Sequence, residues 1–198
     1  MTFSLEELLA IFAFSLVASI SPGPVNLLIL STGVGHGWRR AMPLVVGASG
    51  GFTLLLGLLA AGLGSVWLAL PGLQWLVRLA GLSFVAWLAW RLLTDAGDWG
   101  TDQRREPPGP ATGALMQWLN PKAWIASLAG LGLFTAGRES VDIALFTLVW
   151  GSVCLASAIG WAWLGGHARG WLSCEARRRV LQRLLAALLI FSGALMLL

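Results

Sequence analysis

The sequence is poor in charge. Asp, Glu, Lys and Arg make up only 11% of its 198 residues, whereas soluble domains carry about 25%. Hydrophobic residues account for 57% of the chain, more apolar surface than a soluble fold of this length would bury. These proportions exclude an ordinary soluble domain and indicate a membrane protein.

The sequence also has few cysteines and no basic residue at its start, which restricts the kinds of site and the targeting signals to expect. Cys154 and Cys174 are the only cysteines, without a CxxC pattern or zinc-ligand spacing, so we expect no disulfide framework, metal or cofactor. The first apolar segment carries Glu6 and Glu7 and lacks a basic n-region and a cleavage site. We therefore expect it to be a retained span rather than a signal peptide. The net charge of +4 comes from arginine clusters between apolar segments, a pattern that sets membrane topology and does not require nucleic acid.

Six apolar segments approach or exceed the roughly 20 residues that a helix needs to cross a bilayer. They are residues 5–32, 42–63, 73–93, 113–136, 143–164 and 180–198. The uncharged stretch 41–77 is too long for one crossing, and Pro71-Gly72 is expected to mark its turn. The sequence thus predicts an all-α membrane protein with six transmembrane helices.

The basic residues indicate the orientation. All thirteen except Arg78, Lys122 and Arg138 lie at the connections after the first, third and fifth spans. Arg138 alone falls on the opposite side, and Arg78 and Lys122 lie within spans. The positive-inside rule therefore places both termini outside the cytoplasm.

Residues 94–112 form the only extended polar connection, with four acidic residues and three prolines. This cytoplasmic linker divides a single transmembrane domain, residues 1–198, into repeat one (1–93) and repeat two (113–198). Each half holds three spans. After three crossings the chain is on the opposite side of the membrane from where it started. The second half therefore enters the membrane from the other side, and if the halves are homologous they form two inverted three-helix repeats.

Two proline motifs interrupt spans one and four. The first proline motif is Ser21-Pro22-Gly23-Pro24, and the second is Leu119-Asn120-Pro121-Lys122. Proline removes a backbone donor and clashes with the preceding turn, so each motif should break its helix. In hydrocarbon, a freed carbonyl is tolerated only where it is buried in protein or lines a wet cavity. Paired broken helices in two halves indicate a transport site, although proline kinks that only shape packing remain an alternative.

The candidate site follows from these motifs. A zwitterionic ligand needs donors for its carboxylate and acceptors for its ammonium group, and a broken helix offers both. One wall is expected to contain Pro22, Gly23, Pro24 and Asn26, and the other Gln117, Asn120, Pro121 and Lys122.

Lys122 has two open interpretations. A charge at the bilayer centre costs about 2.5–3.5 kcal/mol on insertion scales, so this lysine either attracts a substrate carboxylate or changes protonation state, or else it snorkels to the interface. Arg78 raises the same question, and snorkelling is favoured there. No Asp or Glu lies in the middle of a predicted span, although proton-coupled transporters usually carry a buried acid.

A competing motif is Gly47-Ala48-Ser49-Gly50, which reads as the GxSG of a rhomboid intramembrane protease. Such an enzyme needs a histidine within hydrogen-bond reach of its serine. The two candidate histidines, His36 and His167, lie at the cytoplasmic edge of the membrane. Ser49 is roughly 13 Å deeper in the membrane than Arg40, so neither histidine can easily reach its hydroxyl. A protease and a non-transporting structural subunit remain as alternatives to a transporter.

With these motifs in hand, the chain resembles the LysE/RhtB family of amino-acid exporters over almost its whole length. The resemblance rests on both proline motifs, residues 35–39 (GHGWR), Gly47 and Gly51, and residues 81–85 (GLSFV). It implies a secondary transporter in the bacterial inner membrane that exports small, mostly neutral amino acids or derivatives. Proton coupling and alternating access are implied with it.

Within this family the chain is most similar to the cysteine/O-acetylserine exporter branch, through residues 87–91 (WLAWR), Cys154 and the ending after Arg179. It departs from the pattern at Phe84, where the family usually has Tyr. It departs again at Cys154, where some homoserine and threonine exporters have an acid. The expected partners are a small amino acid and the lipid bilayer; small-residue faces are compatible with a homodimer, but nothing specifies one.

Overall fold

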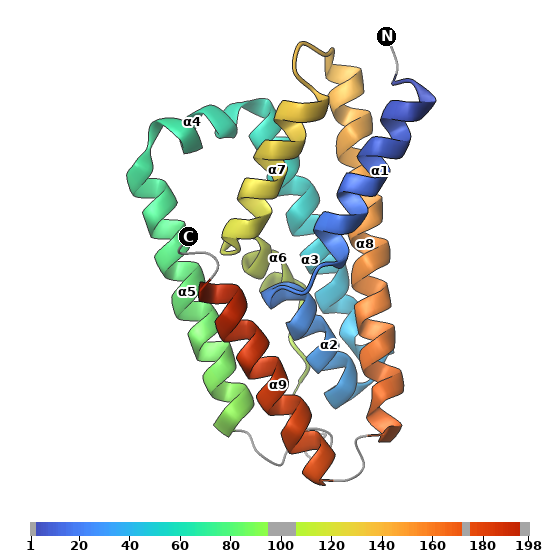
Figure 1. The fold of residues 1–198 in the computed structure, drawn as a ribbon, viewed down its shortest axis with the longest axis vertical. Helices are drawn as coiled ribbons and strands as arrows, with labels where there is room; N and C mark the ends of the chain where they lie inside the picture. The colour runs from blue at the N-terminus through green and yellow to red at the C-terminus, as the bar shows by residue number, and fades with distance from the viewer. Residues whose placement is uncertain (1–2, 95–105, 172–174, 195–198) are drawn as a thin grey trace.

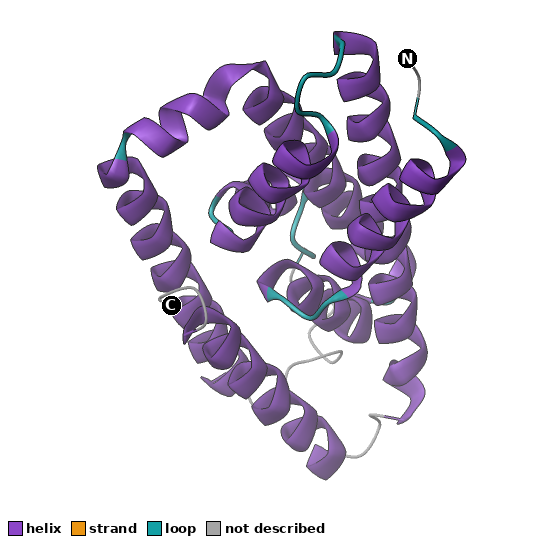
Figure 2. Cartoon of the chain, turned by 45° about the horizontal axis from the view of Figure 1, so that its top comes forward, coloured by secondary structure: helices purple, strands orange, loops and turns teal. Residues whose placement is uncertain are grey.

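The computed structural model describes residues 3–94, 106–171 and 175–194, and these residues form helices joined by loops, without a strand (Figures 1 and 2). The elements in chain order are α1 (Leu5–Ile20), α2 (Pro24–His36), α3 (Trp38–Leu58), η1 (Leu59–Leu63), α4 (Gly64–Ala69), α5 (Pro71–Thr94), α6 (Pro110–Trp118), α7 (Pro121–Phe134), α8 (Ser140–Trp171) and α9 (Glu175–Ala194). The all-α prediction holds for the described residues. Cys174, most of the predicted linker and the end of the sixth predicted span lie outside them.

The first proline motif breaks its helix as predicted. α1 starts with a capping box, in which the Glu7 N–H donates to the Ser4 hydroxyl and the Ser4 N–H donates to the Glu7 carboxylate. It ends at Ile20, and α2 starts at Pro24, a position where the missing N–H costs nothing. The axes of α1 and α2 differ by 62°, so the chain changes direction sharply at the motif.

The second proline motif also separates two helices. α6 ends at Trp118 and α7 starts at Pro121. Asn120 is the N-cap of α7, because its side-chain oxygen accepts a hydrogen bond from the Lys122 N–H at 3.2 Å. Both predicted interruptions are therefore confirmed.

Three predicted helix boundaries are wrong. Gly37, with φ 86°, turns the chain directly from α2 into α3, so Arg39 lies in the first turn of a helix and not in a connection. The second apolar helix does not stop at residue 63, because the π-helical turn η1, kinked at Gly62 (φ 121°), continues it into α4. α8 has 32 residues and extends beyond the predicted 143–164 at both ends. The predicted turn at Pro71 is confirmed, since α5 starts there.

Part of the structure is apolar and long enough to cross a membrane. Within the described ranges, Trp38–Ala69 and Ser140–Ala168 meet this condition by length and composition, and the bent pair α1 and α2 makes a third if it is one broken span. This finding agrees with a helical membrane protein. It does not establish six crossings.

Two hydrophobic cores lie on opposite sides of the helix breaks. One core joins α2 with the first half of α3 and the later parts of α5, α8 and α9, and Ile29 and Leu189 lie at its centre. The other joins α1 and α7 with the second half of α3 and the start of α8, around Phe146 and Trp150. The space between the two cores is therefore the level at which both helices are broken.

Glycines bring helix backbones into direct contact. α3 packs along both α6 and α8, α2 packs on α8, and α5 packs beside α9 (Figure 1). A Cβ atom on Gly47 would collide with the backbone of Pro110, and one on Gly51 would lie 2.6 Å from Ala114 Cα. Small residues allow such close packing in membranes, so the predicted role of these two glycines in packing is confirmed.

We expect Gly47→Ala to destabilise the protein by about 1–3 kcal/mol, because the added methyl group overpacks a contact between two backbones. Gly50→Ala, on the same helix, is the matched control: a Cβ atom there meets nothing within 4 Å, and alanine is the better helix former. Thermal unfolding in detergent measures both variants. Equal melting temperatures for the two variants would contradict the packing at Gly47.

Candidate functional site

The two helix breaks meet at one point. The Lys122 ammonium group, at the start of α7, donates to the backbone carbonyl of Ser21 at 3.3 Å and to the Ser21 hydroxyl at 2.5 Å. Gly23 faces the same side chain, since a Cβ atom there would lie 3.7 Å from Lys122 Nζ. Residues 101 positions apart in the sequence thus form one contact between the two proline motifs.

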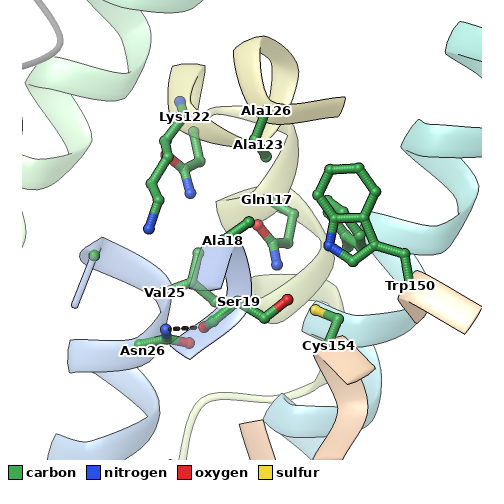
Figure 3. Close-up of a pocket in the computed structure, with 13 residues that line it drawn as sticks. Ala18, Ser19, Val25, Asn26, Gln117, Lys122, Ala123, Ala126, Trp150 and Cys154 are labelled. Atoms are coloured by element: carbon green, nitrogen blue, oxygen red, sulfur yellow. Dashed lines mark hydrogen bonds between the residues drawn. The ribbon is translucent and has the colours of Figure 1, made fainter. Parts of the chain in front are cut away.

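The carbonyls freed at the first break have side-chain partners. The Asn26 amide donates to the Ser19 carbonyl at 2.7 Å (Figure 3) and to the Ser21 carbonyl at 3.0 Å. The Ser157 hydroxyl, from α8, also donates to the Ser19 carbonyl at 3.0 Å. An unpaired carbonyl in an apolar environment costs several kcal/mol, so these donors explain how the break is tolerated.

Tryptophan side chains hold the second break. Trp124 donates its indole N–H to the carbonyl of Trp118 at 2.9 Å, and Trp118 donates to the carbonyl of Gly51 on α3 at 3.2 Å. α5 also reaches this break, because a Cβ atom on Gly81 would collide with the carbonyl of Leu119. Lys122 therefore extends from a fixed segment.

A small cavity of about 50 Å³ lies between the two breaks (Figure 3). Its wall contains Ala18, Ser19, Gly23, Val25, Asn26, Phe52, Gln117, Asn120, Lys122, Ala123, Ala126, Trp150 and Cys154. Gln117 and Asn120 are buried polar residues. Within the described part of the chain, the Gln117 amide has no hydrogen-bond partner, so it is free to bind a polar ligand.

The structure brings together most of the residues predicted for the site. Gly23, Asn26, Gln117, Asn120 and Lys122 all line the cavity. The break between α6 and α7 brings the last three together. Pro22 and Pro121 line an adjacent apolar cavity, and Pro24 is buried at the start of α2.

Four further residues are weaker candidates from the sequence: Ser49, Arg78, Phe84 and Cys154. Of these, only Cys154 lines the cavity. Ser49 lines a separate apolar cavity between α3 and α8, Phe84 packs on the core below the breaks, and Arg78 lies against the ring of Trp75. Sequence reasoning missed Ser19, Phe52 and Trp150. The only signal for Phe52 in the sequence is its position directly after the packing glycine Gly51. No motif indicates that Ser19 or Trp150 reaches the site.

The environment of Ser49 does not support a serine protease. Its hydroxyl is buried and has no hydrogen-bond partner among the residues that the structure describes. The His167 ring nitrogen is instead bonded to the carbonyl of Trp163, 2.9 Å away on the same helix. Without a histidine in contact, nothing activates the serine as a nucleophile.

Lys122 is the only lysine of the chain, and no carboxylate pairs with it in the described ranges. Ion pairs elsewhere join Arg138 to Glu7 and to Asp142, at the beginnings of α1 and α8. Both partners of the Lys122 ammonium group are neutral oxygens. Nor does any group of three or more His, Cys, Asp or Glu among these residues form a metal site. The cavity therefore contains a cation without a counter-ion.

The model of the family described as LysE type translocator matches residues 16–198. The chain belongs to the LysE-type translocator family. This finding confirms the resemblance to exporters, and it places the protein among transporters rather than enzymes.

Several curated relatives of this LysE-type translocator share one description. A "Cysteine/O-acetylserine efflux protein" of Escherichia coli O139:H28 (strain E24377A / ETEC) is 32% identical over 188 residues, which cover 92% of this chain and 93% of the relative. The protein of that description from Escherichia coli (strain K12) is 31% identical over 80% of this chain and 81% of its own length. The one from Salmonella choleraesuis (strain SC-B67) is 30% identical over 75% and 80%. No solved structure matches the chain.

We expect Asn26→Leu to lower the free energy of unfolding by about 1–3 kcal/mol, because two carbonyls of the break lose a donor. Ser152→Ala is the control: its exposed hydroxyl bonds only to Leu148 on its own helix, and its loss should change stability little. Unfolding in detergent, followed by circular dichroism, measures both. If Asn26→Leu were as stable as Ser152→Ala, the amide would not hold the break.

Proposed function

We propose that this LysE-type translocator exports small, mostly neutral amino acids or their derivatives, of the cysteine and O-acetylserine type, from the cytoplasm. The observation that carries the proposal is Lys122, an ammonium group without a counter-ion at the meeting point of two broken helices. A partly buried cation without a counter-ion is costly, and a substrate carboxylate would neutralise it. The names of the curated relatives support this class of substrate.

The cavity wall offers a group for each part of an amino acid. Lys122 and the amide of Gln117 would receive the carboxylate. The Ser21 carbonyl accepts a hydrogen bond from Lys122, and when Lys122 moves to the substrate this carbonyl would become an acceptor for the substrate's ammonium group. Phe52, Trp150 and Cys154 would then surround the side chain, so a short side chain is favoured.

The same proposal covers the architecture. We propose six membrane crossings in two inverted three-helix repeats, in an inner membrane, with both termini outside the cytoplasm. In its support, the half-helix before each break packs on the second span of the other repeat, α1 on α8 and α6 on α3. Rocking of one repeat against the other would open the cavity to one side at a time.

Proton coupling is part of the proposal and predicts a response to pH. Substrate efflux from loaded proteoliposomes should be faster when the outer buffer is made acidic than at equal pH on both sides, because an inward proton gradient would drive an exporter. Radiolabelled O-acetylserine or cysteine measures the rate, and protein-free liposomes give the leak. If the protein-dependent rate did not respond to the gradient, coupling to protons would be wrong.

Lys122→Met separates a binding role from a structural one. Loss of a buried charge that pairs with substrate costs about 2 kcal/mol or more, so we expect roughly 30-fold weaker transport in a counterflow assay with neutral amino acids. Stability should change little, since the Ser21 carbonyl keeps its hydrogen bond from Asn26 and a cation without a counter-ion is removed.

Lys122→Arg keeps the charge and should retain part of the activity, although its planar head group does not reproduce the lysine geometry. Normal transport by Lys122→Met would show that the lysine does not bind substrate. Lost transport together with lost stability would show that its main role is to hold the two breaks together.

A further inference from the structure

A second cavity adjoins the site. It has a volume of about 750 Å³ and lies between α1, α7 and α9. Its wall is almost entirely apolar and consists of Phe14, Val17, Ala18, Ser21, Pro22, Pro121, Lys122, Ile125, Ala126, Ala129, Leu188 and Phe191. Small-molecule sites usually measure about 300–1,000 Å³, so this space has the size of a ligand site.

Lys122 belongs to both cavities. Together with Ala18 and Ala126 it separates the small polar cavity from the large apolar one. Both alanines are small, so the lysine side chain, held on Ser21, forms the polar part of the boundary. A movement of this one side chain away from Ser21 would connect the two spaces.

The chemistry of the large cavity defines its ligand. Lys122 is the only charged residue in its wall, and it lies beside the helix break. The remaining wall is made of aliphatic and aromatic side chains from three helices, of which Val17, Ile125 and Phe191 are more than half exposed. A cation at one end of an apolar chamber is complementary to an anionic head group that carries an apolar tail.

The wall of this cavity restricts the ligand further. It offers one ammonium group, that of Lys122, and one continuous apolar space. A single-chain carboxylate carries one small anionic group and one tail, so it matches this wall.

We propose that the cavity between α1, α7 and α9 binds single-chain carboxylates with an extended apolar tail, with the carboxylate on Lys122 and the tail between Ile125, Leu188 and Phe191. The inference rests on the proposed function in one respect, the position of Lys122 within the bilayer. Such ligands come from two sources: amino acids with a long apolar or acyl substituent, and free fatty acids of the membrane. Either would compete with a small amino acid for the same ammonium group.

Photolabelling tests this site directly. Decanoate with a terminal diazirine is the probe, and decanol with the same diazirine is the comparison, both applied to the full chain in nanodiscs with peptide mapping by mass spectrometry. We expect decanoate to label α7 and α9 near Ile125 and Leu188 about tenfold more than decanol does, because the alcohol offers Lys122 a neutral acceptor and loses the attraction between opposite charges. Equal labelling by the two probes would show that the cavity takes only lipid tails and would overturn the proposal.

Ala129→Phe separates this inference from the proposed function. Ala129 lines the apolar cavity but not the polar one, so a phenyl ring there should reduce decanoate labelling about tenfold while O-acetylserine efflux continues. Ala187→Phe, at an exposed alanine of α9, is the control and should change neither. Leu188→Trp provides a second obstruction should Ala129→Phe fold poorly. Unchanged labelling in the obstructed variants would overturn the cavity as the site, whereas absent efflux in the unmodified protein would instead contradict the proposed function.

Competition and counterflow together distinguish acylated amino acids from free fatty acids as the ligand. Excess N-decanoyl glycine and excess decanoate should both displace the probe from unmodified protein, and counterflow with radiolabelled N-decanoyl glycine would identify it as a transported substrate. If neither competitor reduced the labelling, a specific carboxylate site would be contradicted.

Discussion

The structure depends on how two interrupted helices satisfy their freed backbone groups in an apolar environment. At the first break, the Ser19 and Ser21 carbonyls accept from Asn26, Ser157 and Lys122. Asn120 caps the helix that follows the second break. Because Lys122 belongs to the second motif and bonds to the first, it links the two breaks. The same contact places a cation and the Gln117 amide in the wall of a small cavity, so the feature that joins the broken helices also shapes the candidate site.

The rest of the fold positions this contact. One hydrophobic core lies on each side of the breaks. Close glycine contacts hold α6 on α3 and α8 on α2, which keeps the half-helices at fixed positions on the longer helices. Each core joins helices from both halves of the chain, so a rocking of one repeat against the other would have to slide helices past each other within both cores.

Much of this was predictable from the sequence, because proline acts locally. The two interruptions, the turn at Pro71 and the packing glycines of α3 follow from residue types whose effects do not depend on distant contacts. Helix ends were less predictable: α8 is longer than its apolar core, and Gly62 kinks a helix without ending it. Asn26, Gln117 and Asn120 were predicted from the motifs, whereas Ser19 and Trp150 reach the cavity only through the packing of α1 and α8. The contact between Lys122 and Ser21 arises from long-range packing that no local pattern contains.

The central claim is that the Lys122 ammonium group exchanges the Ser21 carbonyl for a substrate carboxylate. Because the chain has a single lysine, protein labelled with ¹⁵Nζ-lysine gives one signal, which needs no assignment. Solid-state dipolar recoupling between this nitrogen and the ¹³C-carboxyl carbon of bound O-acetylserine measures their separation. We predict strong dephasing, as for a direct ion pair, together with a weaker coupling to ¹³C-labelled Ser21 than in the substrate-free protein. A lysine nitrogen that remains coupled to Ser21, and shows no coupling to saturating substrate, would contradict the account.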